Sequence, residues 1–248
     1  MITNIATVLA LLPTQTRARV EGFSRAAQDA LGHDLAALIV YGSAVRGGLT
    51  PRSDVDIIAV LRTDHAELLR SLHDAAAVAR AAARVDLRIM LLDEIPRAAD
   101  VFPIFFDDVR GCHAVLFGHD PFKDLVIHDE HRRLRVEQEL REARMALRRL
   151  VVDHAFDMVA LRADVQGLIK RVRAPLHSLL HLHDSSARDD LVTVLDIVGR
   201  RLGVDTLPLT SSDQDPVLVA DACAVLLDKA IDDVDQLSAL SARPDGGH

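Results

Sequence analysis

The first third of the chain shows a pattern of apolar and polar positions that predicts three strands. An apolar run covers residues 35–41, and a second run at 57–61 continues a strand predicted over 54–61. Residues 84–92 alternate between apolar and polar side chains, which is the period of a strand. Residues 14–31 and 64–83 instead carry apolar positions at helical spacing. The order strand, turn, strand, helix, strand predicts an α+β fold with a mixed sheet flanked by helices.

The second half of the chain is predicted to be a helical bundle. A helix begins near Asp129, and the next one carries a stripe of apolar side chains at helical period. This stripe is formed by Val165, Leu168, Ile169, Val172, Leu176, Leu179 and Leu180. Pro175 lies within the stripe and should kink or split that helix. Two further helices are expected over 187–202 and 215–240.

The length of 248 residues is enough for one large or two small domains. We expect the α+β domain over residues 1–125 and the bundle over 126–242, followed by a disordered tail over 243–248. Hydrophobic residues make up 49% of the chain and aromatic residues only 3%. The core should therefore consist mainly of Leu, Val, Ile and Ala side chains.

Charge and cysteine content exclude several classes of protein. The net charge of −8 argues against a broad nucleic-acid surface, because such surfaces carry clustered positive charge. Cys112 and Cys223 are far apart and fit neither a disulfide framework nor a metal motif. The chain has no convincing signal peptide and no run of the roughly 20 apolar residues that a membrane helix needs. We expect a soluble cytoplasmic protein without a membrane partner.

The segment GSAVRGGLTPRSDVD, residues 42–56, carries the chemistry. Gly42 allows the backbone to turn tightly after the first strand and to approach a ligand, and the Ser43 hydroxyl can bond a phosphate oxygen. Asp54 and Asp56 lie two residues apart on the next strand, so their side chains share one face of the sheet. Two such carboxylates repel each other unless a cation lies between them. Magnesium is the natural candidate, since it prefers oxygen ligands and leaves positions open for substrate phosphates.

The longer string YGSAVRGGLTPRSDVDIIAV, residues 41–60, resembles the signature of the DNA polymerase beta nucleotidyltransferase superfamily. It is similar to the aminoglycoside adenylyltransferases that act on streptomycin and spectinomycin, and to the minimal nucleotidyltransferases. The resemblance implies that Ser43 contacts a nucleoside triphosphate. It also implies that Asp54 and Asp56 hold two magnesium ions.

The same family pattern expects a third carboxylate on a later strand beside the first pair, and Asp86 is our candidate. It is the single acid within a strand that otherwise looks buried, and it shares a face with Arg88 and Met90. In that role it would bind metal and help to deprotonate the attacking hydroxyl, directly or through the metal. The alternative is an acid near the strand end that faces solvent. Two neighbouring acids, Asp93 and Glu94, are interpreted as caps of the next helix.

Basic side chains should hold the departing pyrophosphate. Arg46 follows Ser43 directly and is the nearest candidate, although it could equally be a solvated surface arginine. In related enzymes a basic residue of the helical domain often reaches the triphosphate, and Lys170 is our candidate for this role, with Arg171 and Arg173 as alternatives.

We therefore expect an enzyme that transfers a nucleotide, with AMP from ATP as our first choice, onto a hydroxyl group. An aminoglycoside is one candidate acceptor. The alternatives are modification of a protein partner, as minimal nucleotidyltransferase antitoxins do, and a nucleotide-binding module without turnover.

Overall fold

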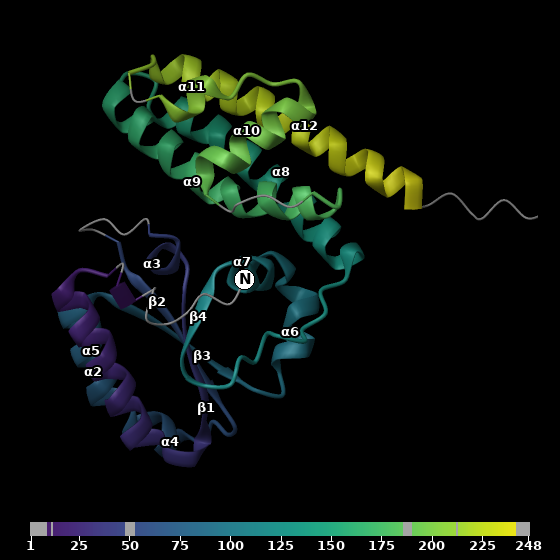
Figure 1. Ribbon diagram of the computed structural model, residues 1–248. Coiled ribbons are helices and arrows are strands. Elements are labelled where there is room, and N and C mark those ends of the chain that lie inside the picture. The colour runs from purple at the N-terminus through teal and green to yellow at the C-terminus, as the bar shows by residue number, and fades with distance from the viewer. Residues whose placement is uncertain (1–8, 11, 48–52, 186–189, 212, 242–248) are drawn as a thin grey trace, which may run out of the picture. The chain divides into compact units, whose positions relative to one another are not determined.

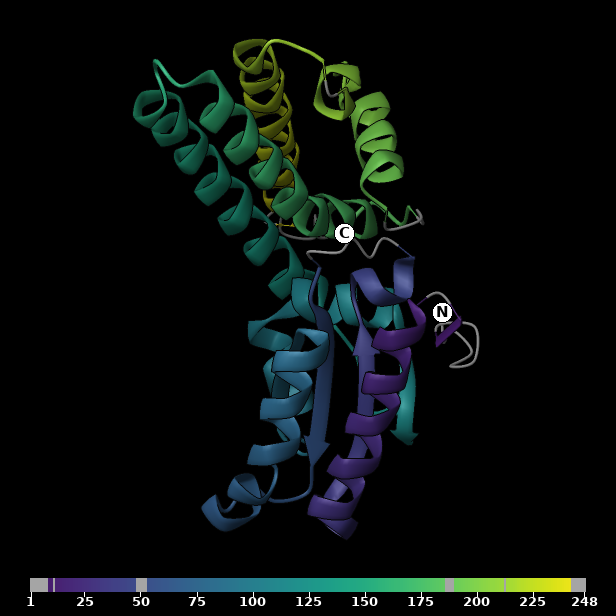
Figure 2. The same cartoon turned by 90° about the vertical axis from the view of Figure 1, so that its left-hand side faces the viewer.

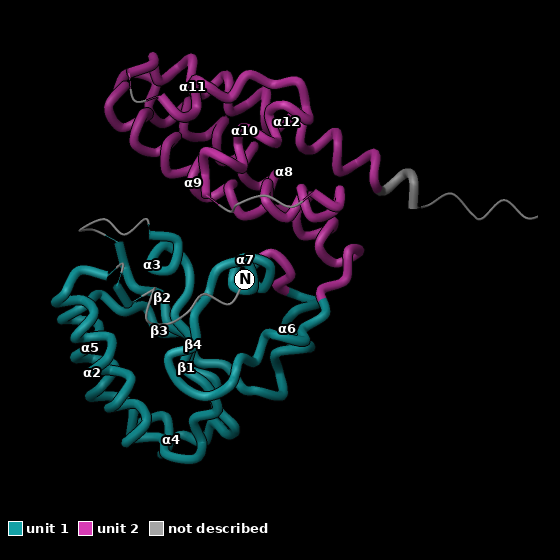
Figure 3. The backbone as a smooth tube through the Cα atoms, in the orientation of Figure 1, with its two compact units in different colours: residues 1–101, 105–126 teal, residues 102–104, 127–248 magenta. Residues whose placement is uncertain are grey.

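The computed structural model describes residues 9–10, 12–47, 53–185, 190–211 and 213–241. The chain forms two compact units, one of residues 1–101 and 105–126 and the other of residues 102–104 and 127–248 (Figure 3). Each is described by itself below. The predicted disordered tail over 243–248 lies outside the described residues.

The first unit is built around a four-stranded mixed sheet in the order β3-β2-β1-β4 (Figure 1). Its strands are β1 (Leu35–Tyr41), β2 (Val55–Leu61), β3 (Val85–Leu91) and β4 (His113–Gly118). Strand β1 pairs antiparallel with both β2 and β4, whereas β2 and β3 are parallel. The predicted α+β class and the mixed sheet are thus confirmed.

The helices of this unit cover the sheet. They are α2 (Thr14–Leu31), α3 (Ser43–Arg46), α4 (Ala66–Ser71), α5 (His73–Ala83), α6 (Ile95–Val101) and α7 (Pro103–Gly111), with a short 3-10 turn, η1, at Gly32–Asp34. Helices α2 and α5 lie side by side against the sheet (Figure 2). Phe23 of α2 and Ala79 of α5 belong to one buried cluster with Leu38 and Val40 of β1 and Ile57 of β2.

The predicted helix over 64–83 is interrupted at Leu72. The Leu72 amide donates a hydrogen bond to the Leu69 carbonyl at 3.3 Å, three residues back, which tightens the last turn of α4. The Leu72 side chain is buried. The chain therefore continues into α5 with an apolar anchor at the junction.

Strand β3 is less buried than its sequence suggests. It lies at the edge of the sheet, and among its residues only Val85 is fully buried. Ile89, an apolar residue of this strand, is 43% exposed. An edge strand has a neighbouring strand on one side only. Apolar alternation therefore predicts which of its side chains share a face, but not how deeply those side chains are buried.

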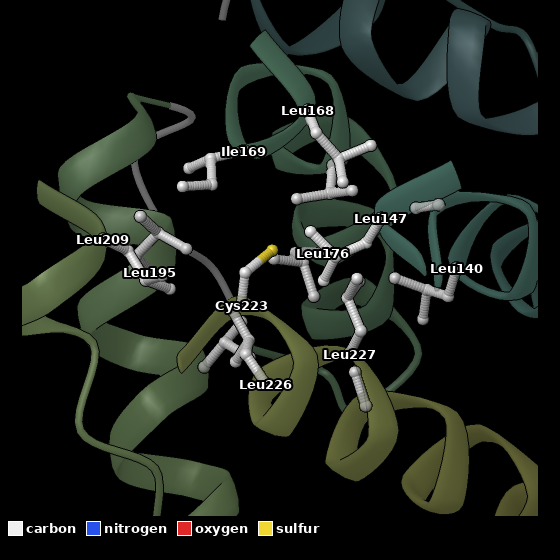
Figure 4. Packing of buried hydrophobic residues seen from close by; sticks show 14 of the residues in the cluster. Leu140, Leu147, Leu168, Ile169, Leu176, Leu195, Leu209, Cys223, Leu226 and Leu227 are labelled. Atoms are coloured by element: carbon white, nitrogen blue, oxygen red, sulfur yellow. The ribbon is translucent and has the colours of Figure 1, made fainter. Parts of the chain in front are cut away.

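The second unit is a helical bundle. Its helices are α8 (Asp129–Asp153), α9 (Met158–His181), α10 (Leu191–Leu202), α11 (Leu207–Thr210) and α12 (Pro216–Ser241). Leu140 and Leu147 of α8 pack in one buried cluster with Leu176 of α9 and with Cys223 and Leu227 of α12 (Figure 4). Pro175 does not split α9, which runs unbroken through it. The proline removes one backbone donor from the ladder, and the buried side chains on both sides of it keep the helix in register.

Ion pairs on the bundle surface join α8 to α12. Arg141 donates to both carboxylate oxygens of Asp235 at 2.9 Å, and the Arg144 Nε atom lies 2.7 Å from an Asp228 oxygen. Cys112 and Cys223 are both free. Among the described helices, none is both long enough and apolar enough to cross a membrane.

Candidate active site

The candidate site lies at the end of the sheet where β1 ends and β2 and β3 begin. In the antiparallel pair Tyr41 is opposite Asp56, and in the parallel pair Asp56 is opposite Asp86. Asp56 therefore lies between the other two in the strand order. The neighbouring positions Val55 and Val85 belong to the buried cluster under α2 and α5. Because side chains alternate along a strand, Asp56 and Asp86 point to the opposite face of the sheet.

Gly42 brings the backbone against this pair. Its φ of 72° lies in the left-handed region, and a Cβ atom at this position would be 2.6 Å from the Asp56 Oδ2 atom. A side chain is therefore excluded by both backbone conformation and space. The close approach places the Gly42 backbone, one residue before Ser43, next to the Asp56 carboxylate. Helix α3, which begins at Ser43, has only four residues, so the half-buried Ser43 hydroxyl is a better phosphate donor than any helix dipole.

The Asp56 carboxylate is held in an unfavourable environment for its charge. Burial, followed by the neighbouring Asp86 charge, raises the pKa of Asp56 from 3.8 to about 6, and Asp54 adds to this rise. Arg88 and Arg46 act in the opposite direction. The balance leaves negative charge that the surrounding residues do not neutralise. A divalent cation at this point would relieve it.

Asp54 is directed differently from the other two acids. Its Oδ1 atom accepts a hydrogen bond from Arg84 Nε at 2.9 Å, and both side chains are more than half exposed. Across the part of the chain that the structure describes, no three His, Cys, Asp or Glu side chains form a group that could hold a metal ion. We expected the three acids to converge. The structure instead pairs Asp56 with Asp86 and turns Asp54 toward a guanidinium.

The donor chemistry still fits a hard divalent cation. All three candidates are carboxylates, the ligands that magnesium prefers, and their charges already act on one another. Asp86 is exposed and thus accessible to a ligand. Asp54, Asp56 and Asp86 are the residues that would hold the ion.

The two predicted phosphate-binding cations have different surroundings. The Arg46 Nη2 atom lies 2.6 Å from Asp108 Oδ1, and the two side chains are only 16% and 19% exposed. Arg46 is therefore not the solvated surface arginine that we considered as its alternative. Lys170 is an exposed residue of α9 in the second unit, and its role in binding the triphosphate stays a prediction.

Breaking the Arg46–Asp108 pair should destabilise the first unit. We expect Asp108→Asn to lower the free energy of unfolding by about 1–3 kcal/mol, because a largely buried guanidinium loses its charged acceptor. Urea unfolding of both proteins would measure the difference. The exposed Asp93→Asn variant, which has the same change of chemistry, should stay within about 0.5 kcal/mol of the original. Equal stability of all three proteins would show that the pair contributes nothing.

Arg88 was not among our sequence candidates, yet it lies within the site. Its guanidinium donates a hydrogen bond to the Tyr41 hydroxyl, and its Cζ atom is 5.0 Å from the centroid of the Phe105 ring. Phe105 in turn contacts Tyr41 edge-on at 5.9 Å. Burial raises the pKa of Tyr41 to about 12, so this hydroxyl stays protonated at neutral pH. The period-2 pattern that places Arg88 on the face of Asp86 was the signal that could have found it.

Asp93 and Glu94 lie in the turn between β3 and α6, and the expected capping of that helix by their side chains stays a prediction. Glu94 accepts a hydrogen bond from the Leu91 amide at 2.9 Å, just before α6 begins at Ile95. Asp93 is exposed at the far end of β3. Asp86 is therefore the one acid of this region that lies opposite Asp56 in the sheet.

Comparison with known proteins agrees with this geometry. Residues 20–107, which contain the segment from Gly42 to Asp56 as well as Asp86 and Arg88, match the family model of the nucleotidyltransferase domain. The structure is similar to that of spectinomycin adenyltransferase AAD(9) from Enterococcus faecialis, crystallised with ATP and spectinomycin. That match has a TM-score of 0.51 at 11% sequence identity and covers 88% of this chain and 98% of the other. No curated protein is significantly similar in sequence. The chain carries a nucleotidyltransferase domain and is a nucleotidyltransferase enzyme.

Proposed function

We propose that this enzyme transfers AMP from ATP to a hydroxyl group of a small molecule in a magnesium-dependent reaction. The observation that carries the proposal is the meeting of the Gly42–Ser43 turn with the Asp56–Asp86 pair at one end of adjacent strands. The turn suits a phosphate, and the pair of carboxylates suits a divalent cation. Their proximity suits a metal-bound nucleoside triphosphate.

Each residue has a distinct role in this scheme. Ser43 binds the triphosphate, and Asp86 accepts the proton of the attacking hydroxyl. The hydroxyl oxygen forms a bond to the α-phosphorus while the bond from that phosphorus to the oxygen bridging to the β-phosphate breaks, and pyrophosphate leaves. Asp54, Asp56 and Asp86 would hold magnesium, which when bound neutralises the phosphate charge and stabilises the entering and leaving oxygens.

An aminoglycoside is the acceptor that we test first. The net charge of −8 favours a polycationic partner, and the similar adenyltransferase was crystallised with spectinomycin.

Both cysteines are free, which agrees with a reducing cytoplasm as the compartment.

Labelled ATP identifies both the group that is transferred and the molecule that accepts it. The protein is incubated with magnesium and ATP labelled at the α-phosphate, together with spectinomycin, streptomycin or a lysate that contains co-expressed neighbouring proteins. We expect the label on an aminoglycoside and no transfer from ATP labelled at the γ-phosphate. Label on a protein would favour the protein-modifying alternative. Label from the γ-position alone would show phosphoryl transfer and contradict the proposal.

A further inference from the structure

The ion pair between Asp54 and Arg84 occupies an oxygen that the proposed metal site needs. The Arg84 Nε atom lies 2.9 Å from Asp54 Oδ1, with the two side chains 57% and 53% exposed. Among the described residues, Arg84 is the one hydrogen-bonding partner of the Asp54 side chain. A divalent cation that binds Asp54 therefore competes with a guanidinium.

The backbone of Arg84 is fixed in a way that keeps its side chain at this place. Arg84 caps the C-terminus of α5 with a φ of 52°, a left-handed conformation that residues other than glycine adopt rarely. Its amide donates to the Arg80 carbonyl at 3.1 Å, and its carbonyl accepts from the Val55 amide at 3.0 Å. Arg84 is thus hydrogen-bonded both to α5 and to Val55, which is the first residue of β2 and follows Asp54 directly. The side chain beyond this anchor is 57% exposed and holds Asp54.

A cavity lies beside the Asp54–Arg84 ion pair. It has a volume of about 360 Å³ and is lined by Asp54, Arg80, Arg84, Val85 and Asp86. Arg80 lies in the last turn of α5 and Arg84 is its C-terminal cap, and both line this cavity. Two guanidinium groups therefore border the same cavity as two of the candidate metal ligands. Guanidinium groups suit phosphate oxygens because they can donate two parallel hydrogen bonds.

We propose that Arg84 is an exchangeable counter-ion: it neutralises Asp54 in the metal-free enzyme and moves to the phosphates, beside Arg80, when a divalent cation takes its place. This inference rests on the proposed function. The exposure of the pair makes the exchange inexpensive, since exposed ion pairs contribute little to stability. Arg84 thereby prevents three carboxylates from facing one another without a cation, and it supplies positive charge to the triphosphate once that cation has arrived.

One substitution should change two affinities in opposite directions. We expect Arg84→Gln to raise the affinity for Mn²⁺ alone about two- to fivefold, which is the strength of an exposed ion pair. The same variant should bind pyrophosphate in the presence of Mn²⁺ about tenfold more weakly, because a charge-assisted hydrogen bond is lost. Titration calorimetry measures both, with Mn²⁺ and inorganic pyrophosphate as the probes. Circular dichroism melting verifies that each variant is folded.

Matched variants separate the ion pair from general electrostatics. Arg80→Gln removes the same charge from the same cavity without a contact to Asp54, so it should weaken pyrophosphate binding while leaving Mn²⁺ affinity unchanged. Arg84→Lys keeps the charge and should fall between the original and Arg84→Gln in both measurements. In an Asp54→Asn background, Arg84→Gln should no longer affect Mn²⁺ binding.

The outcomes also separate this inference from the proposed function. Unchanged or lower Mn²⁺ affinity in Arg84→Gln would overturn the exchange, even if the enzyme transfers AMP. The opposite changes in the two affinities would support it, even if the acceptor panel gave no product. Absence of any Mn²⁺ binding by the unsubstituted protein would also overturn the exchange, whereas failure to transfer the α-phosphate label to any acceptor would overturn only the proposed function.

Discussion

Replacing Asp56 with asparagine is expected to reduce nucleotidyl transfer by about 10²–10³-fold or more. Asp56 lies between Tyr41 and Asp86 in the register of the sheet and beside Gly42, so its carboxylate is the central one of the three that we propose as metal ligands. Asparagine keeps the shape of the side chain but removes its charge. Asp93→Asn, at the other end of β3, should keep full activity. Transfer of label from ATP labelled at the α-phosphate, measured at saturating ATP, compares Asp56→Asn and Asp93→Asn with the unsubstituted protein.

The same substitution is expected to stabilise the metal-free protein. Burial and the Asp86 charge raise the pKa of Asp56 from 3.8 to about 6, so between these values the folded protein binds more protons than the unfolded chain. Stability therefore falls as pH rises through this window, and the full penalty is present above about pH 6. After allowance for solvent screening of this partly exposed group, we expect Asp56→Asn to gain on the order of 1 kcal/mol at pH 7.5.

Thermal unfolding in EDTA, at pH 4 and at pH 7.5, measures this effect. The advantage of Asp56→Asn should be present at pH 7.5 and small at pH 4, where the unsubstituted Asp56 is protonated in the folded state. Excess magnesium should reduce the advantage at pH 7.5, because the cation stabilises only the protein that binds it. An inactive variant that is also less stable in EDTA would mean that the Asp56 carboxylate supports the fold and not the chemistry.

Gly42→Ala should damage both stability and activity. The φ of 72° is strained for any residue with a Cβ atom, and that atom would lie 2.6 Å from Asp56 Oδ2. The strained conformation costs about 1–3 kcal/mol. The carboxylate or the turn must then shift, so transfer should fall by about 10²-fold or more, as misplaced catalytic groups do. Urea unfolding and the labelled transfer assay measure the two effects.

Gly22→Ala is the matched control for this substitution. Gly22 lies within α2, and a Cβ atom there would meet nothing within 4 Å. Alanine favours a helix interior over glycine by about 1 kcal/mol, so this variant should gain stability and keep its activity. If Gly42→Ala were as active as Gly22→Ala, the close approach of the turn to Asp56 would have no role in the reaction.

The sequence by itself determined strands β1, β2 and β3, the long helices of the bundle and the motif of this protein. Apolar runs in the sequence predict strands β1 and β2, and a stripe of apolar side chains at helical period predicts α9. These patterns depend only on local geometry. The residue types and spacing from Gly42 to Asp56 were enough to indicate a nucleotidyltransferase, which the family model confirms over residues 20–107. The period of a strand also placed Asp86 and Arg88 on one face.

The tertiary structure decided which side chains are partners. It places β3 at the edge of the sheet. It also forms the ion pairs Arg84–Asp54 and Arg46–Asp108, which join residues 30 and 62 positions apart in the sequence. No local pattern encodes such contacts, since a charged side chain can satisfy its charge with any partner that the fold brings near. The sequence therefore indicates the chemistry of the site, and only the packing of the sheet determines which cation each aspartate faces in the absence of metal.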